Sequence, residues 1–372
     1  KFSLCQITTK LFMGEMIMKK NKLLFLILEL CILTFSCCYF YFSHLSEKPE
    51  SSPSVYRTEK EWIEKPMTRN GQILLRLADN QRADHPTSIA CDYFADLVAE
   101  RTEGRIQIIP YHASKLGDEK STLSQLHYGG IDMVRTSIAL LTDYNPELTV
   151  LEMPYIYRDS QHMWQVLDSE LGDYFLQSLE RSGLEGLCWF DAGARNFYTT
   201  DKPITKPEDL EGLYIRVQQS SFMVDLVSIL GANPIDLPYE AVSTQLKQQR
   251  IDGAENNFPS YVSTGHYLAA PYMVMDGHTR IPEMIVINKK ILEELEPEDQ
   301  EILRQAASDA SIFQRNLWES EEQKAKETFI KSGGQITYLE DQAAFVKKVQ
   351  PLYNTYAYRY QGFLEAIQAV GQ

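Results

Sequence analysis

The alternation of strand-like and helix-like segments from residue 71 onward limits the fold of this chain most strongly. Short apolar runs typical of strands are separated by segments whose apolar residues recur at helical spacing. We expect strands at 73–78, 105–110, 131–134, around Leu187 and around Ile215, and helices at 85–104, 119–128, 161–181, 222–230 and 239–249. This rhythm predicts an α/β protein with open, largely parallel sheets and helices on both faces. Ligands of such folds bind beyond the carboxyl ends of the strands.

One expected helix is much longer than the others. Residues 298–331 contain neither glycine nor proline, and Leu303, Ala306 and Ala310 begin an apolar stripe at helical spacing. The segment ends at a Gly-Gly pair, and at 1.5 Å per residue it is roughly 50 Å long. A chain of 372 residues is long enough for two compact lobes. The long helix therefore predicts a strut that crosses two lobes, and a helix that dimerises is the alternative.

Arg216 is the residue that most directly suggests a ligand. In the apolar run 212–218 it points away from the face of Ile215 and Val217. A guanidinium there is partly desolvated and keeps its proton, so it needs an anion, yet the next six residues contain no Asp or Glu. The partner is either a structural acid or a carboxylate from outside. A second arginine, Arg195, follows the preceding expected strand, and two such arginines suit a fork around one anionic group.

The charge balance and the missing motifs exclude several classes of function. Thirty-six basic against fifty-one acidic residues leave a net charge of −15, which repels nucleic-acid backbones. The sequence contains no nucleophile motif and no phosphate-binding loop, and its seven histidines are not spaced as metal ligands. Asp252 and Glu255 resemble an acid–base pair, but nothing beside them supplies a nucleophile. We expect no enzymatic activity, no cofactor and no metal.

The N-terminal residues resemble a secretory signal. A basic stretch at 18–22 precedes an apolar stretch at 23–35, and Cys37 follows in a pattern similar to bacterial lipoprotein signals. We expect lipidation at Cys37, with the adjacent Cys38 as the alternative site. Residues 23–42 are also long enough for an uncleaved membrane anchor. In either case the rest of the chain is expected outside the cytoplasm and tethered to the membrane.

Around this signal, residues 1–17 are expected to precede the true start at Met18, and 38–70 are expected to form a flexible stalk. Only two of the six cysteines, Cys91 and Cys188, fall in the body of the chain. Both lie in apolar patterns, which favours buried thiols over a disulfide.

A series of short motifs then occurs in a fixed order between residues 73 and 356. They are Leu77–Asn80, Lys115–Asp118, Gly130–Met133, Met153–Tyr155, Pro207–Val217, Gly231–Pro234 and Ile251–Asn256. With these motifs the chain resembles the extracytoplasmic solute-binding proteins of TRAP transporters, the DctP type.

The resemblance implies an α/β, two-lobed fold like that of periplasmic binding proteins, with mixed sheets and a long helix across both lobes. It places lobe I at 71–192 plus about 282–318, and lobe II at 193–281 plus about 319–372. It implies hinge closure on a small organic acid and delivery to a membrane permease driven by an ion gradient. We expect a monomer.

The resemblance also implies roles for particular residues. Arg216 would pair with the ligand carboxylate, Arg195 would support it, and Asn256 would bind the same end. The remaining candidates are Asn80 from the other lobe, Tyr239 lining the pocket, Arg135 and Ser137 facing the far end of the ligand, and, less directly, His85 and Glu255. Arg135 replaces a small or apolar residue common in relatives, which suggests an extra polar or charged ligand group.

The motifs 79–81, 84–87 and 191–195 resemble those of uronate binders, so the expected ligand is a hexuronate such as glucuronate or galacturonate. Sialic acid, another sugar acid and a C4-dicarboxylate remain alternatives. Two other classes also remain open. One is a secreted lyase or hydrolase of acidic sugars with Tyr239 or His85 as base, and the other is a sensor that presents its ligand to a receptor.

Overall fold

The computed structural model describes residues 67–69 and 71–371, all of which fall in one compact unit, Thr58–Gln372. The expected signal, both candidate lipidation sites and nearly all of the stalk lie outside the described residues. None of the helices within 71–371 combines the length and the apolar character needed to cross a bilayer.

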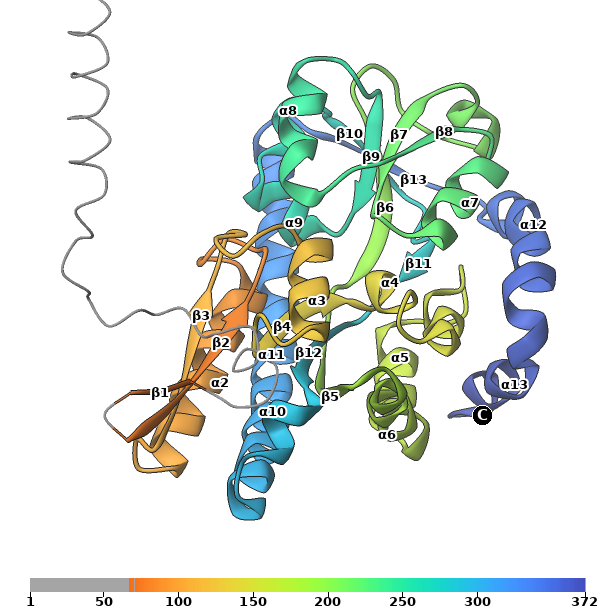
Figure 1. Ribbon diagram of the computed structural model, residues 1–372. Coiled ribbons are helices and arrows are strands. Elements are labelled where there is room, and N and C mark those ends of the chain that lie inside the picture. Colours follow the sequence, from red (N-terminus) through yellow and green to blue (C-terminus); the bar gives the residue numbers. More distant parts are fainter. Residues whose placement is uncertain (1–66, 70, 372) are drawn as a thin grey trace, which may run out of the picture. The chain divides into compact units, whose positions relative to one another are not determined.

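Two sheets organise this unit (Figure 1). The first has the order β1-β2-β4-β12-β5, with β3 also paired to β2. Its strands are β1 (Met67–Arg69), β2 (Gln72–Ala78), β3 (Ile106–Tyr111), β4 (Met133–Ser137), β5 (Leu184–Phe190) and β12 (Glu283–Asn288). The second has the order β13-β10-β6-β9-β7-β8, with β11 also paired to β6. Its strands are β6 (Ala194–Thr199), β7 (Tyr214–Val217), β8 (Asn233–Asp236), β9 (Gly253–Asn256), β10 (Tyr272–Met275), β11 (Thr279–Arg280) and β13 (Gln335–Tyr338).

Both sheets are mixed, as the family resemblance implied, and the expectation of largely parallel sheets from the alternation alone was wrong. Strand β12 runs antiparallel to β4 and β5, and β6 runs antiparallel to β9, β10 and β11. The reason is that the chain passes from β5 to β6 and from β11 to β12 through short connections that lead from one sheet to the other. Strands β6 and β12 therefore enter their sheets from the other sheet, and no helical crossover from a strand of the same sheet fixes them in the parallel direction.

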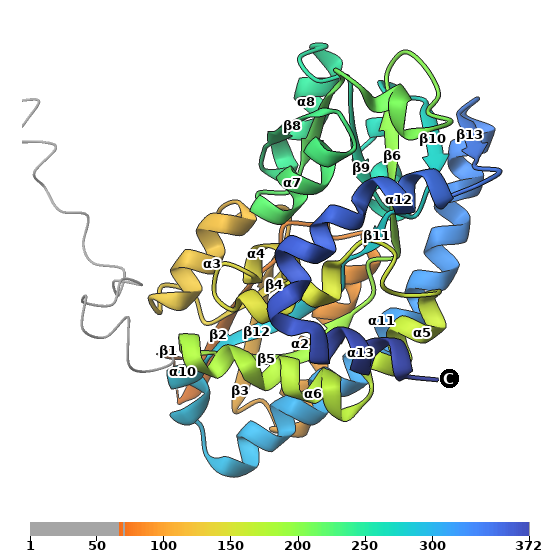
Figure 2. The same ribbon diagram turned by 90° about the vertical axis from the view of Figure 1, so that its right-hand side faces the viewer.

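Helices cover the sheets on both sides (Figures 1 and 2). They are α2 (Pro86–Arg101), α3 (Glu119–His127), α4 (Ile138–Leu141), α5 (Ser160–Leu167), α6 (Glu170–Gln177), α7 (Ser221–Ile229), α8 (Val242–Lys247), α9 (Phe258–Ser263), α10 (Lys289–Glu293), α11 (Pro297–Lys331), α12 (Ala343–Leu352) and α13 (Gln361–Ala369). Short 3-10 turns fill several connections, including Pro146–Glu152 and Tyr239–Ala241.

The single helix expected at 161–181 was wrong, because the structure has two helices with a break between them. Ser169 caps α6 by accepting a hydrogen bond from the N–H of Leu171 at 3.2 Å, and its hydroxyl donates to the carbonyl of Val166 at 2.7 Å. Gly172 lies so close to α5 that an added Cβ would stand 1.9 Å from the carbonyl oxygen of Leu167. The break is not visible in the sequence pattern, because apolar residues recur at helical spacing in both helices.

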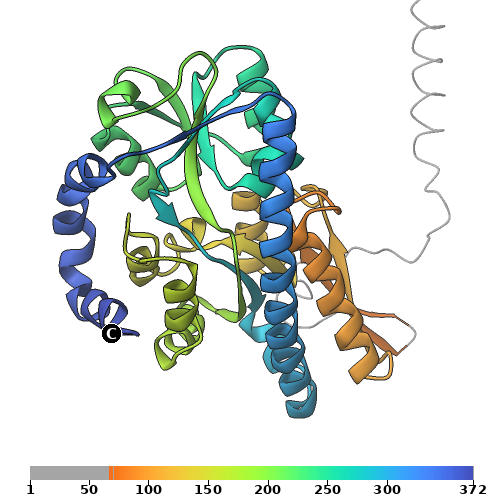
Figure 3. The same ribbon diagram turned by 180° about the vertical axis from the view of Figure 1, so that it is seen from behind.

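The long helix α11 is confirmed, and it runs alongside both sheets (Figure 3). Its first half buries Leu303, Ala306 and Ala310 in a core cluster shared with α2, β2 and β12. Its second half buries Ala325 and Phe329 in another cluster shared with α9 and β10. Because one rigid helix contributes to both clusters, it forms the strut that the sequence predicts.

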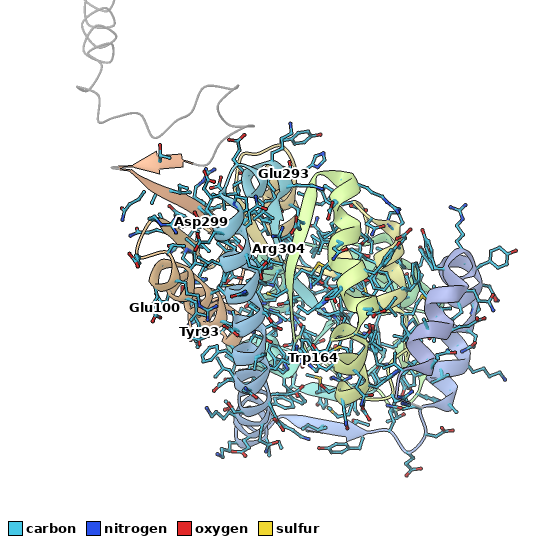
Figure 4. All side chains as sticks on the ribbon, turned by 90° about the horizontal axis from the view of Figure 1, so that it is seen from below. Tyr93, Glu100, Trp164, Glu293, Asp299 and Arg304 are labelled. Carbon is cyan, nitrogen blue, oxygen red and sulfur yellow. The ribbon has the colours of Figure 1, made fainter. Side chains whose placement is uncertain are left out.

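Polar contacts fix α11 against the first sheet. Figure 4 shows Asp299 and Arg304 on this helix near α2, which carries Tyr93 and Glu100. Asp299 pairs with Arg105 at 2.7 Å, and Arg304 pairs with Glu185 of β5 at 2.8 Å.

The C-terminal helices leave the second sheet and run back toward α5 and α6 (Figure 2). The imidazole Nε2 of His162 lies 2.9 Å from the carbonyl of Ile367, and Arg158 donates to the carbonyl of Val370 at 2.8 Å. The end of the chain therefore contacts helices that precede β5. The lobe boundaries expected from the resemblance stay a prediction.

Cys91 and Cys188 are both free and buried. The expectation of thiols in this part of the chain is confirmed, and the pair belongs to the core cluster around α2 and β5.

Candidate ligand-binding site

Arg216 is a buried cation without an acidic partner. It lies on β7, between β8 and β9, and only 3 % of the residue is exposed. Its Nε and Nη2 donate to the carbonyl of Leu237 at 2.9 and 2.7 Å. Among the described residues it forms no ion pair. Burial lowers the pKa of Arg216. The negative charge of Glu255 raises this pKa, and the positive charge of Arg195 lowers it further. A buried charge of this kind is costly unless an anion reaches it.

Arg195 is compensated within the protein. It lies on β6, and its Nε and Nη2 donate to the Glu255 carboxylate, with Nη2 at 2.9 Å from Oε1 and 3.1 Å from the backbone oxygen. Burial alone would raise the pKa of Glu255, but the Arg195 charge and the contact with His278 lower it to about 2. The two arginines are not on neighbouring strands, because β9 lies between β6 and β7. Only one of them offers an uncompensated charge.

Asn256 ends β9, the strand between the two arginines. Its Oδ1 accepts a hydrogen bond from the N–H of Asn257 at 2.9 Å, which fixes the orientation of the amide. The amide nitrogen of Asn256 has no hydrogen-bond partner among the described residues. The second sheet thus brings a guanidinium without an acidic partner and a free amide donor onto the neighbouring strands β7 and β9.

Arg135, on β4 of the first sheet, is occupied by protein acids. It is 1 % exposed, donates to Asp79 and to the amide oxygen of Asn80, and pairs with Glu283 at 3.0 Å. Burial opposes its charge, but Glu283 and Asp79 raise the pKa of Arg135. We expected Arg135 to indicate an extra charged group on the ligand. Its hydrogen bonds and ion pairs in the structure go to Asp79, Asn80 and Glu283.

Glu119 is a polar residue of this region that the sequence reasoning missed. As the first residue of α3 it accepts hydrogen bonds from Asn80 at 3.0 Å, from the Thr136 hydroxyl at 2.8 Å and from the Ser137 N–H at 2.7 Å. Ser137 in turn caps α4 through the N–H of Ala139. The available signal was position, because Glu119 directly follows the motif Lys115–Asp118.

Two hydrogen bonds join residues that follow strands of different sheets. The Tyr239 hydroxyl donates to Oε1 of Gln81 at 2.9 Å, and the imidazole Nε2 of His85 lies 3.4 Å from the Ser260 hydroxyl. Ser260 belongs to α9, which packs against the second half of α11. Gln81 and Ser260 were not among the predicted site residues.

The electrostatics of His85 and Tyr239 do not suit proton transfer. Burial, with help from the Arg135 charge, lowers the pKa of His85 to about 3. Burial raises the pKa of Tyr239 to about 12. A general base works best with a pKa near the working pH, so neither side chain is prepared for that role. Within 71–371 no group of three or more His, Cys, Asp or Glu is arranged to hold a metal ion.

Comparison with known proteins gives consistent matches. Residues 77–359 match the family described as bacterial extracellular solute-binding protein, family 7, or DctP. A solute-binding protein of Chromohalobacter salexigens is 37 % identical over 272 residues, which cover 73 % of this chain and 81 % of that protein.

Solved structures agree with this match. A TRAP periplasmic solute-binding protein of Xanthobacter autotrophicus Py2 with bound β-D-galacturonate has a TM-score of 0.78 and 38 % identity, covering 80 % of this chain and 99 % of the other. A TRAP periplasmic solute-binding protein of Chromohalobacter salexigens with bound D-glucuronate has a TM-score of 0.77 and 34 % identity, with the same coverage of 80 % and 99 %.

Proposed function

This chain belongs to the DctP family of bacterial extracellular solute-binding proteins, and from that membership we propose that it captures a hexuronate, glucuronate or galacturonate. It works outside the cytoplasm as the binding component of a TRAP transporter and hands the ligand to the membrane permease. Structural relatives with bound uronates at 34 % and 38 % identity support this ligand class.

The observation that carries the proposal is the unpaired charge of Arg216. A uronate carboxylate would supply the anionic partner that Arg216 lacks among the described residues. The free amide nitrogen of Asn256 would bind the same carboxylate. Hydrogen bonds to charged groups contribute about 1.5–3 kcal/mol each. Arg195, held by Glu255, would support this end of the ligand from β6, the strand next to that of Asn256.

The far end of the proposed site suits hydroxyl groups better than a second carboxylate. Glu119 presents a carboxylate there, and Arg135 is already neutralised by Asp79 and Glu283. A second acid on the ligand would meet negative charge without a free cation, whereas sugar hydroxyls can donate to Glu119. This favours a sugar acid over a C4-dicarboxylate.

Binding would draw the two sheets together. Tyr239 with Gln81, and His85 with Ser260, already link elements of both sheets. A ligand that contacts both sides stabilises the arrangement in which these contacts form, because it shifts a conformational equilibrium only through unequal affinity for the two states.

A calorimetric and thermal-shift panel tests the ligand. The purified protein is titrated with galacturonate, glucuronate, N-acetylneuraminate and succinate. We expect tight binding and a raised melting temperature with at least one uronate. The proposal fails if no uronate binds, or if succinate or N-acetylneuraminate binds more tightly than both uronates.

Attachment to the membrane through a lipid on Cys37, or on Cys38, and a monomeric state in solution are further parts of this proposal. Mass spectrometry of the N-terminal peptide from the cellular protein identifies a diacylglyceryl cysteine, and light scattering measures the mass of the particle. A peptide with an unmodified Cys37 and Cys38 would remove the lipid anchor from the proposal.

A further inference from the structure

A polar pocket of about 170 Å³ lies where the chain passes between the two sheets. Ala194 of β6 and Thr279 and Arg280 of β11 line it, together with the segment Tyr155–Arg158 and Gln342. None of the residues proposed to hold the uronate lines this pocket. It therefore forms a separate space beside the connections β5–β6 and β11–β12.

The strand register shows on which face of the second sheet Arg280 lies. Arg280 is paired with Ala194, and Thr279 is paired with Arg195. Neighbouring residues of a strand point to opposite faces, and directly paired residues share a face. Arg280 and Ala194 therefore lie opposite to Arg195 and its partner Glu255. Asn256 and Arg216 share the face of Arg280, and the pocket is separate from them because neither residue lines it.

The charge of the pocket is unusual for this protein. Its lining includes Arg158 and Arg280 but no Asp or Glu, in a chain whose net charge is −15. Arg280 is half-buried and forms no ion pair with any residue in the described part of the chain. Arg158 donates only to backbone carbonyls, those of Gln368 and Val370. Glu322 lies near enough for the Arg280 charge to lower its pKa against the effect of burial, but no acid lines the pocket itself. Two guanidinium groups in such a lining favour an anion.

Tyr155 and Tyr157 also line the pocket, but their hydroxyl oxygens have almost no accessible surface. The two arginines are therefore the groups that can contact an anion there.

We propose that this pocket binds a small oxyanion, with Arg280 as its main charged contact. The shared chemistry is a compact group of negatively charged oxygens, as in inorganic phosphate or a short carboxylate such as acetate. The pocket is smaller than the 300–1,000 Å³ typical of sites for drug-sized ligands. Ala194 and Arg280 line the pocket and directly adjoin the connections between the two sheets, so an occupant contacts residues next to the part of the chain that must bend when the sheets approach each other. Oxyanion and uronate affinities are therefore coupled, and by linkage the coupling is reciprocal.

The test is calorimetric titration of the full protein with sodium phosphate and, separately, with sodium acetate, each against sodium chloride at matched ionic strength. We expect saturable binding of at least one of the two, which also identifies the source of the oxyanion. Arg280→Gln should weaken this binding by about tenfold or more, the effect of losing one charged hydrogen-bonding partner. The exposed Arg250→Gln is the matched control and should bind as wild type does.

A second variant separates this site from the uronate site. Arg216→Ala should retain the oxyanion affinity of the wild type, because Arg216 does not line the pocket. In the wild type, galacturonate affinity should change by a reproducible factor when the oxyanion is at saturation. The inference is overturned if neither anion binds above the chloride control, or if binding survives Arg280→Gln and is lost in Arg216→Ala. A failure of this kind leaves the uronate proposal intact, since that rests on Arg216.

Discussion

Arg195 and Glu255 form a buried ion pair across the neighbouring strands β6 and β9, whereas Arg216, one strand further along the sheet, has only the carbonyl of Leu237. In the second sheet, therefore, the charge of Arg195 is neutralised by a protein carboxylate and the charge of Arg216 is not.

Replacement of Arg216 should abolish tight uronate binding. Arg216→Ala leaves the ligand carboxylate buried without its partner, which costs about 2–5 kcal/mol, or roughly two orders of magnitude in affinity. Arg216→Lys should not restore binding, because an ammonium group lacks the planar fork of a guanidinium. Calorimetry with galacturonate measures both, with the exposed Arg250→Lys as control. Wild-type affinity in Arg216→Lys would contradict a bidentate contact.

Removal of the charge on Glu255 should destabilise the fold. Glu255→Gln leaves Arg195 buried without its anion, and breaking a buried pair from one side costs about 3–5 kcal/mol. Chemical denaturation measures the free energy of unfolding. The exposed Glu100→Gln serves as the control and should change it by less than about 0.5 kcal/mol. An unchanged stability of Glu255→Gln would show that Arg195 does not depend on this acid.

The same carboxylate should make the protein sensitive to acid. Glu255 has a pKa of about 2 in the folded state against 4.5 for the unperturbed group. The unfolded chain therefore takes up its proton first, so the stabilisation is complete above about pH 4.5 and is lost as the pH falls toward 2. Denaturation midpoints measured between these values should fall more steeply for wild type than for Glu255→Gln. Parallel curves would count against the shift.

Glu152 should have the opposite effect on the pH dependence. Neither oxygen of this buried carboxylate has a hydrogen-bond partner among the described residues, and burial raises its pKa from 4.5 to about 8, although Arg195 opposes the shift. The folded protein holds this proton after the unfolded chain has lost it. Stability from this group is therefore complete below about pH 4.5 and declines as the pH rises to about 8, by at most about 5 kcal/mol.

Glu152→Gln isolates this contribution, because the amide has nearly the same shape and does not ionise. Between pH 5 and about pH 8 the free energy of unfolding should decline less in the variant than in wild type. Glu100→Gln should keep the wild-type slope. If wild type and Glu152→Gln decline together, Glu152 is ionised in the fold.

Loss of the Tyr239 hydroxyl should weaken uronate binding without affecting folding. Tyr239→Phe removes the hydrogen bond to Gln81, which links the two sheets, and a neutral hydrogen bond contributes about 0.5–1.5 kcal/mol. The expected loss in affinity is about two- to tenfold. The exposed Tyr214→Phe is the matched control. Unchanged affinity in Tyr239→Phe would mean that this contact forms equally well without ligand.

Several features of the fold were predictable from local sequence. The helix α11 was predicted because no glycine or proline interrupts 298–331 and its apolar stripe is continuous. A helix opening at His85-Pro86 was also predicted, and in the structure the His85 ring accepts a hydrogen bond from the N–H of Thr87 and caps the helix. The break between α5 and α6 was not predictable, because it depends on the close approach of Gly172 to Leu167.

The sequence by itself determined many of the strands and helices, the family, and the presence of arginines on the strands of one region. Only the tertiary structure decided which arginine is neutralised. Glu255 lies 60 residues after Arg195, and Asp79 lies 56 residues before Arg135, so both pairings arise when distant strands and loops come together. Local patterns indicate that a side chain is buried and charged, but its partner is set by the register and order of strands. The free charge of Arg216 is therefore a property of the assembled sheet.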